Sequence, residues 1–245
     1  IGFHKSMIGA ILLAAGSGSR MQGEIEDKLL HPIGSSNAFS LCCRSFLELR
    51  EIDYLIITYK TATQLERLQN SWDTLSATVQ EAHEKQVLWV QGGKERQDSV
   101  YAGLLAFPDE ITHVLVHDCA RPFIRTQTIL DCVHEVASGR AITVARPLKD
   151  TLRLRTENVE KPLTPGATKT LNRSNHWLME TPQGAPKSWL IEGLERAKNE
   201  NIALTDDMAA VELLGHPVGL LEPNYPNPKI TTPDDFAYAQ FLFQS

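Results

Sequence analysis

The stretch "ILLAAGSGSRM", residues 11–21, decides the fold. An apolar run stops at two alanines, passes into a Gly-Ser-Gly-Ser loop and reaches Arg20. Strands that are buried on both faces of a parallel sheet are continuous apolar runs of this kind, and a glycine commonly follows them. The stretch therefore predicts a buried strand over 8–13 whose carboxyl end opens into a glycine-rich loop.

Other interpretations of the same stretch fit the chain less well. A dinucleotide-binding fingerprint needs a third glycine where Met21 stands, and an acidic residue about 20 positions on, where residues 35–40 offer none. A Walker A loop needs Gly-Lys-Ser/Thr, but residues 93–95 are Gly-Lys-Glu. A secretory signal stays open, because Lys5 precedes the apolar residues 7–15.

Composition bounds the class of protein. The chain has 245 residues, of which 42% are hydrophobic, and a net charge of -6. It can bury a full core, and it lacks the basic surplus that is typical of nucleic-acid binders. No segment approaches the roughly 18 apolar residues that a membrane span needs. The four cysteines have no metal-binding spacing, so we expect reduced thiols and a cytoplasmic protein (Cys42, Cys43, Cys119, Cys132).

Strand and helix patterns alternate along the chain. Apolar runs predict strands at 8–13, 54–59, 87–90, 114–117 and 141–145. Helical patterns lie at about 36–49, 62–71, 97–107, 127–138, 187–199, 205–214 and 233–243. This alternation predicts an α/β fold with a mostly parallel sheet flanked by helices and a ligand cleft at the carboxyl ends of the strands. We expect a single domain over 7–245, with residues 1–6 as a possible leader added to the natural sequence.

Residues 151–175 break the alternation. Leu152, Leu154 and Leu171 give period-two apolar positions on either side of a Pro165-Gly166 turn signal, which predicts a projecting β-hairpin arm. A lone hairpin has too little core to be stable. We expect the arm to pack against a second copy of the chain; a mobile surface loop is the alternative.

The glycine-rich loop has two cations close behind it. Gly16 and Gly18 would let backbone N–H groups approach phosphate oxygens, and Arg20 and Lys28 would offset the charge that builds up in phosphoryl or nucleotidyl transfer. Such loops also occur as plain turns, so the loop gains its meaning from the motifs that follow it.

Those motifs run in a fixed order: "AAGSGSRM" (14–21), Lys28, "GGKERQDSV" (92–100), "HDCARPF" (117–123), "LKDT" (148–151), "TPQ" (181–183), "TDDMAAVE" (205–212) and "NPKIT" (227–231). Together they resemble the 2-C-methyl-D-erythritol 4-phosphate cytidylyltransferases of the non-mevalonate isoprenoid pathway. The resemblance implies a Rossmann-like nucleotidyltransferase sheet and transfer of CMP from CTP to 2-C-methyl-D-erythritol 4-phosphate. The products would be 4-diphosphocytidyl-2-C-methyl-D-erythritol and pyrophosphate.

The resemblance also implies roles for individual residues. The nucleotide-binding set would be Ala14, Ala15, Gly16, Gly18, Gly93, Arg96, Ser99 and Asp118. The acceptor-binding set would be Asp118, Arg121, Thr151, Arg173 and Lys229. Catalysis would rest on Arg20, Lys28, Arg173 and Lys229, with Mg²⁺ near Asp118. The partners would be the two small-molecule substrates and a second copy of the chain, bound through the arm so that Thr151 and Arg173 reach the partner's site.

Structural alternatives stay open for four of these residues. Ser99 could cap the helix that begins near it, Asp118 and Arg121 could form a structural ion pair, and Arg173 could be a solvated surface charge.

The chain also departs from the family pattern. Leu13 replaces a usual proline, and the usual Pro-Lys-Gln reads Asp27-Lys28-Leu29 after one extra residue. An acid at position 27 could partly neutralise Lys28. A ribitol 5-phosphate cytidylyltransferase and a catalytically idle nucleotide-binding module remain the alternative functions.

Overall fold

The computed structural model describes residues 7–16, 27–79, 85–155 and 168–244. A seven-stranded sheet in the order β11-β7-β10-β6-β1-β4-β5 runs through its centre. Every neighbouring pair is parallel except the two that β10 makes with β6 and β7. The strands are β1 (Met7–Leu13), β4 (Tyr54–Tyr59), β5 (Gln86–Gln91), β6 (Ile111–Asp118), β7 (Ala141–Pro147), β10 (Trp177–Pro186) and β11 (Val218–Leu221). The predicted α/β fold with a mostly parallel sheet is confirmed.

Helices cover both faces of the sheet. One hydrophobic cluster joins the sheet to α1 (Ala38–Leu47), α2 (Ala62–Ser76), α4 (Thr126–Ala137) and α7 (Pro233–Gln244). A second cluster joins the other face to α3 (Arg96–Ala106), α5 (Lys187–Asn199) and α6 (Asp207–Leu213). Successive residues of a strand face opposite ways, so Leu12 enters the first cluster and Ile11 the second. This double burial explains why the central strands are continuous apolar runs.

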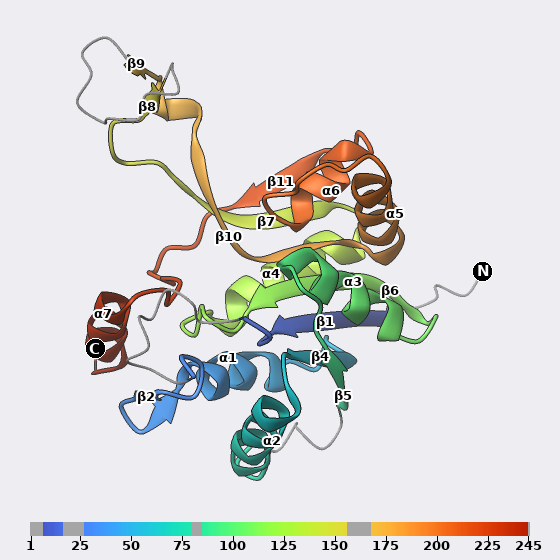
Figure 1. Cartoon of the computed structure of the whole chain (residues 1–245), viewed down its shortest axis with the longest axis vertical. Coiled ribbons are helices and arrows are strands. Elements are labelled where there is room, and N and C mark those ends of the chain that lie inside the picture. Colours follow the sequence, from blue (N-terminus) through green and yellow to red (C-terminus); the bar gives the residue numbers. More distant parts are fainter. Residues whose placement is uncertain (1–6, 17–26, 80–84, 156–167, 245) are drawn as a thin grey trace.

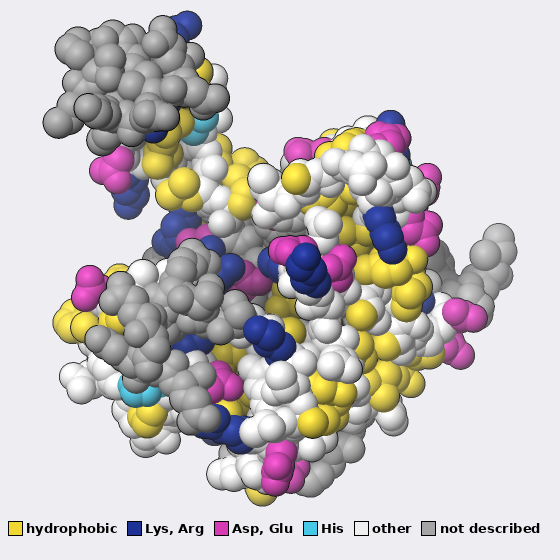
Figure 2. All heavy atoms as spheres, in the orientation of Figure 1, with side chains coloured by type: hydrophobic (Ala, Val, Ile, Leu, Met, Phe, Trp, Pro, Cys, Tyr) yellow, Lys and Arg dark blue, Asp and Glu magenta, His cyan; other side chains and the backbone are white. Residues whose placement is uncertain are grey.

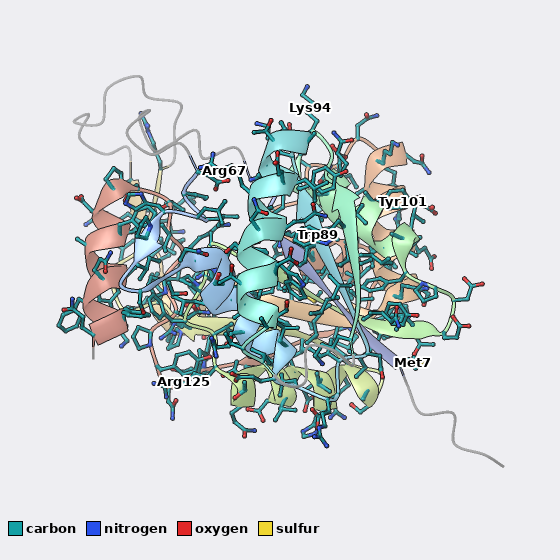
Figure 3. All side chains as sticks on the ribbon, turned by 90° about the horizontal axis from the view of Figure 1, so that it is seen from below. Met7, Arg67, Trp89, Lys94, Tyr101 and Arg125 are labelled. Atoms are coloured by element: carbon teal, nitrogen blue, oxygen red, sulfur yellow. The ribbon has the colours of Figure 1, made fainter. Side chains whose placement is uncertain are left out.

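The carboxyl ends of β1 and β6 lie side by side, because Leu13 pairs with Asp118 in the parallel register. The chain leaves β1 toward β4 and β5 and returns to β6 on the other side of β1, so the sheet has a topological switch point here. Figure 3 shows Lys94, just beyond β5, at the top of the view and Met7, at the start of β1, at the lower right. The ligand cleft is therefore expected at the end where Lys94 lies.

The hairpin arm projects from the body between β7 and β10 (Figure 1). Its tip carries the antiparallel pair β8 (Arg153–Arg155) and β9 (Thr168–Thr170), and the N–H of Leu171 donates to the carbonyl of Leu152 at 2.9 Å. The Pro165-Gly166 turn lies outside the described residues. Leu154 is 51% exposed, so the arm brings an apolar side chain to the surface without covering it within this chain.

Most predicted elements are confirmed, with shifted ends. The first helix begins at Ala38 and not at 36, because Asn37 caps it and pairs with Pro32 in the small sheet of β2 (Pro32–Ile33) and β3 (Ser36–Asn37). The second helix runs five residues further than predicted, to Ser76. The sequence prediction missed β10 and β11.

Two other expectations from the sequence concern the ends and the apolar segments of the chain. Residues 1–6 lie outside the described part of the structure. Among the residues that are described, no helix is long and apolar enough to cross a membrane.

Candidate functional site

A cavity of about 390 Å³ opens where the carboxyl ends of the parallel strands meet. Its walls come from the ends of β1, β4 and β6, from the loop between β5 and α3, and from the segment that precedes α7. The lining includes five cationic side chains: Lys28, Lys60, Lys94, Arg96 and Lys229. Figure 2 shows Lys and Arg side chains gathered around a hollow below the base of the arm. Such a cavity suits a polyanionic ligand.

Asp118 and Asp207 organise the cations at the back of this cavity. Arg96 donates from Nη1 and Nη2 to the carboxylate of Asp207 at 2.9 and 2.8 Å, and from Nε to Asp118 Oδ1 at 3.1 Å. The second oxygen of Asp118 accepts a 2.6 Å hydrogen bond from Lys229 Nζ. The sequence left open a structural pair between Asp118 and Arg121, and this pairing is wrong: the ion pairs of Asp118 are with Arg96 and Lys229.

The electrostatics of these groups follow from their burial and their partners. Burial by itself would raise the pKa of Asp118, but the charges of Arg96 and Lys229 outweigh it and hold that pKa well below its ordinary value. Burial raises the pKa of Asp207 even beside Arg96. Burial lowers the pKa of His117, the residue before Asp118, to about 4. At neutral pH the back wall therefore holds ionised Asp118 beside a neutral imidazole.

A second cavity, of about 230 Å³, adjoins the first and shares Arg96, Asp118 and Lys229 with it. Arg121 and Glu180 line it from the turn after β6 and from β10. Arg121 Nη1 lies 3.9 Å from Glu180 Oε1 and donates to the carbonyl of Asn227 at 3.0 Å. The shared wall of three charged residues separates two cavities that could each hold an anionic ligand.

Gly93 and Ser99 form one unit in the lining of the first cavity. The hydroxyl of Ser99 accepts from the Gly93 N–H at 3.1 Å and donates to the Glu95 carbonyl at 3.3 Å. A Cβ at position 93 would lie 2.2 Å from Cβ of Asp98, so only glycine lets the loop approach α3 this closely. Glu95 is the N-cap of α3, within a capping box completed by Asp98. The alternative reading of Ser99 as a helix cap is therefore wrong.

Lys28 lies in the first cavity, and its ammonium group donates to the carbonyl of Ile230 at 3.2 Å. The neighbouring Asp27 carboxylate accepts hydrogen bonds from the N–H of Leu29 at 3.0 Å and from Gln64 Nε2 at 3.4 Å. Asp27 thereby holds the turn that carries Lys28. Asp27, which departs from the family pattern, therefore stabilises the turn before Leu29 through these hydrogen bonds.

The start of the glycine-rich loop rests on β4 and α2. The N–H of Ala14 donates to Thr58 Oγ1 at 3.2 Å, and the Ala14 carbonyl accepts from Gln64 Nε2 at 3.1 Å. Ala15 and Gly16 line the first cavity, whereas Ala14 is fully buried and supports them from below. Gly18 and Arg20 lie outside the described residues, so the predictions for them stay predictions.

Thr151 and Arg173 lie in the arm and not at the cavities of their own chain. Both are exposed, and Arg173 donates to the carbonyl of Lys149 within the arm. Neither residue lines the first or the second cavity. The structure thus brings together Lys28, Gly93, Arg96, Ser99, Asp118 and Lys229, adds Arg121 in the second cavity, and leaves the two arm residues apart.

Sequence reasoning missed several residues that line or support the cavities. Asp207 lies within the quoted "TDDMAAVE", so a signal existed, but nothing in the sequence chose between Asp206 and Asp207. Lys94 lies within the quoted "GGKERQDSV" but was given no role, and Glu180 and Lys60 carried no signal beyond their places next to a motif or a strand end. In the described ranges, no group of three or more His, Cys, Asp or Glu side chains is arranged to hold a metal ion.

Comparisons with known proteins agree with this geometry. The family model for 2-C-methyl-D-erythritol 4-phosphate cytidylyltransferase matches residues 8–245. The enzyme of this name from Pelotomaculum thermopropionicum is 32% identical over 238 residues, which are 97% of this chain and 94% of that protein. Its counterpart from Prochlorococcus marinus is 33% identical over 231 residues, covering 94% and 95% of the two chains.

A solved structure supports the fold by itself. The crystal structure of 4-diphosphocytidyl-2C-methyl-D-erythritol synthase from Anaerococcus prevotii superposes with a TM-score of 0.80 at 23% identity. The match covers 98% of this chain and 97% of that one. With a family model that spans nearly the whole chain and relatives above 30% identity along more than nine-tenths of it, the chain belongs to the 2-C-methyl-D-erythritol 4-phosphate cytidylyltransferase family.

Proposed function

We propose that the two adjoining cavities bind CTP and 2-C-methyl-D-erythritol 4-phosphate side by side and that the chain transfers CMP from the first to the second. The observation that carries this proposal is the shared wall of Arg96, Asp118 and Lys229. A nucleotide in the first cavity and a phosphorylated polyol in the second would meet at that wall, where the α-phosphate must lie for transfer. The products are 4-diphosphocytidyl-2-C-methyl-D-erythritol and pyrophosphate.

The chemistry needs positioning and charge stabilisation more than a strong base. The acceptor phosphate is already anionic at neutral pH, so its oxygen can attack the α-phosphorus directly while the bond to the β-phosphate oxygen breaks. Lys28 and Lys229 stand where charge would build up around the α-phosphate and the leaving pyrophosphate. Arg20 is proposed to join them from the glycine-rich loop. The N–H groups of that loop are proposed to hold the nucleotide, with Gly93 and Ser99 lining the cavity beside them.

Magnesium is part of the proposal. Each oxygen of Asp118 holds one cationic side chain and keeps a further lone pair, so this carboxylate suits a site whose other ligands are phosphate oxygens and water. When bound, the ion supplies neutralisation of the triphosphate charge. Asp118 is the acidic residue common to the described linings of both cavities, which makes it the best placed protein ligand.

A homodimer with crossed arms would complete the site. Thr151 and Arg173 belong to the arm that projects in Figure 1, and neither lines the first or the second cavity of its own chain. Leu154, Leu178 and Met179, on the arm and at its base, are 51%, 55% and 38% exposed. Burying them against a second copy would remove apolar surface from water and bring Arg173 to the partner's second cavity.

The cytoplasm is the proposed location. All four cysteines are free and buried in the fold. Free thiols are usual where the surroundings are reducing, and disulfides are usual in secreted proteins.

Pyrophosphate release tests the reaction. CTP with methylerythritol phosphate should be the best substrate pair, because we propose that the Gly93–Ser99 unit in the first cavity contacts the cytosine and leaves no room for a purine. ATP and GTP should be poor donors. Ribitol 5-phosphate should be a poor acceptor. Comparable turnover with ATP would contradict the nucleotide assignment, and preference for ribitol 5-phosphate would identify the sister enzyme.

Subunit mixing tests the crossed site separately. Arg173→Ala and Lys28→Ala are each expected to be inactive alone. A mixed dimer holds one doubly damaged site and one intact site, so full exchange of equal amounts should restore about one quarter of wild-type activity, assuming random pairing. If mass spectrometry shows that subunits have exchanged but the activity stays at that of the separate mutants, the crossed site is wrong and Arg173 is a surface charge.

A further inference from the structure

His117 is a buried residue of β6 that lines neither cavity yet touches two residues that do. It has no exposed surface, and its ring lies 5.3 Å from that of Phe46 in the core. Nε2 lies 3.1 Å from the carbonyl oxygen of Arg121, and Nδ1 lies 3.0 Å from Thr181 Oγ1. The hydroxyl of Thr181 in turn accepts the N–H of Asp118 at 3.1 Å.

The partners fix which nitrogen of His117 carries the hydrogen. The carbonyl of Arg121 can only accept, so Nε2 carries the hydrogen and donates it. Nδ1 is then an acceptor, and the hydroxyl of Thr181 donates to it. The oxygen of that hydroxyl still accepts the hydrogen bond from the Asp118 N–H, so the three donors, which are the Asp118 N–H, the Thr181 hydroxyl and His117 Nε2–H, each have an acceptor. The result is one continuous chain of hydrogen bonds: Asp118 N–H to Thr181, Thr181 to His117, and His117 to Arg121.

This chain ties down both ends of the turn that follows β6. Asp118 is held at its N–H and Arg121 at its carbonyl, and the N–H of Arg121 also donates to the carbonyl of Asp118 at 2.9 Å. Asp118 lines both cavities and Arg121 lines the second. The ring of His117 is therefore linked by hydrogen bonds to the main chain that carries both side chains.

We propose that His117 is a positioning residue for the acceptor: as the Nε2–H tautomer it fixes the main chain of Asp118 and Arg121 so that their side chains meet the second substrate. The inference rests on the proposed function, since it concerns how the acceptor is placed. His117 itself contacts no substrate.

Three variants separate the two hydrogen bonds of the ring. His117→Phe keeps a ring against Phe46 and removes both bonds. His117→Gln can still donate toward the Arg121 carbonyl, and His117→Asn can still accept from Thr181. A displacement of about 1 Å at a reacting group can cost about 100-fold. We expect a loss of about that size in kcat/KM for the acceptor with phenylalanine, and smaller losses with glutamine and asparagine.

The KM for CTP distinguishes positioning from general damage. Lys28, Gly93 and Ser99 share no hydrogen bond with the chain of bonds through His117. The KM for CTP should therefore change less than kcat/KM for the acceptor in all three variants, because Asp118 is the one residue of this chain of bonds that lines the first cavity, whereas Asp118, Arg121 and Thr181 all line the second. His113→Gln, on the same strand and away from both cavities, is the matched control and should behave as wild type.

Two kinetic outcomes would overturn the proposal. One is a phenylalanine variant whose acceptor kcat/KM stays within twofold of wild type. The other is an equal loss for both substrates together with a lower melting temperature, which a merely structural histidine would give. If the phenylalanine variant does not fold, the glutamine and asparagine variants carry the same comparison.

A spectroscopic measurement on the wild-type chain needs no activity. Long-range ¹H–¹⁵N correlation spectra should show the His117 hydrogen on Nε2, beside the Arg121 carbonyl, and an Nδ1–H tautomer would overturn the proposal. Wild-type turnover in the same study reports on the proposed function by itself. An inactive wild type with the expected tautomer would sink the proposed function and, with it, the acceptor role of His117, and leave the hydrogen-bonded chain standing as structure.

Discussion

Arg96 and Asp207 form an ion pair whose two halves should differ in their effect on stability. The Asp207 side chain is 2% exposed and has Arg96 as its ion-pair partner, whereas the Arg96 side chain is 33% exposed and also bonds Asp118. Removing one partner of a buried pair costs about 3–5 kcal/mol when it strands a buried charge. Arg96→Met strands Asp207 in this way. Asp207→Asn leaves the Arg96 guanidinium paired with Asp118 and partly exposed to water. We therefore expect this variant to lose about 1–2 kcal/mol of folding free energy, the size of a hydrogen bond to a charged group.

Thermal unfolding measures the difference in stability between the Arg96 and Asp207 variants. For a chain of this size, 1 kcal/mol shifts Tm by roughly 2–4 °C, so Arg96→Met should lower Tm by about 6–20 °C and Asp207→Asn by about 2–8 °C. Glu135→Gln breaks the exposed pair with Arg140 and is the control, with an expected cost of at most about 1 kcal/mol. All three variants should be measured at one ionic strength, since exposed pairs are screened by salt.

The pH dependence gives a second check with a definite sign. Burial already raises the pKa of Asp207, and loss of Arg96 would raise it further. A carboxyl group whose folded pKa is raised destabilises the fold as pH rises through that pKa. The Tm deficit of Arg96→Met should therefore be smaller at pH 5 than at pH 8. If Asp207→Asn costs more than Arg96→Met, or if both match the exposed control, the argument from burial is refuted.

Three further predictions concern single residues. Asp27→Asn should keep kcat/KM for CTP within about twofold of wild type, because an amide oxygen can still accept the hydrogen bonds that hold the turn of Lys28. Asp27→Ala should lose about tenfold in kcat/KM. Faster turnover with asparagine would show that the charge of Asp27 opposes Lys28. Arg20→Ala should lower kcat by on the order of 100-fold with an unchanged Tm, because the lost interaction is made in the transition state, and near-normal turnover would remove that role. Burial raises the pKa of Cys132 to about 12, so its thiol should resist iodoacetamide at pH 8 until denaturant is added, and prompt labelling of the native chain would contradict the structure.

The central parallel strands β1, β4 and β6 could be predicted because each is covered on both faces. That burial produces continuous apolar runs such as 54–59, and the predicted bounds of this strand agree with β4. The ends of those runs also locate a ligand site, since Asp118 directly follows one of them and parallel strands end at one edge. The local sequence pattern predicts a strand wherever burial on both faces extends along the whole strand.

β10 could not be predicted, because its sequence is unlike a strand. Residues 177–186 contain two prolines, a glycine and a charged Glu180, which are all poorly suited to the middle of a sheet. The structure accommodates them with an irregular register between Met179 and Gln183 on the side of β7. Glu180 was missed with the strand, and so was the second cavity that it lines.

Asp207 shows a different limit of the sequence. Asp206 and Asp207 stand together at the start of α6, where either could cap the helix. In the structure Asp206 accepts from the N–H of Ala209 at 2.9 Å, and Asp207 turns inward to Arg96, 111 residues away in the chain. Which carboxylate pairs with an arginine depends on Arg96, which is distant in the sequence, so the local sequence pattern could not predict it.

The direction of β10 explains why the arm emerges beside the cavities. β10 is antiparallel to both β6 and β7, so β7 runs in the same direction as β6 and ends at the same edge of the sheet as Asp118. The chain must therefore leave β7 and enter β10 at that edge, and the whole arm between them is carried there. A parallel strand in the place of β10 would need a crossover that begins at this edge and ends at the other. The antiparallel insertion thus puts Thr151 and Arg173 on an arm that leaves the sheet at the edge where the two cavities lie, and their exposure in this chain is compatible with the proposed contact to a second copy.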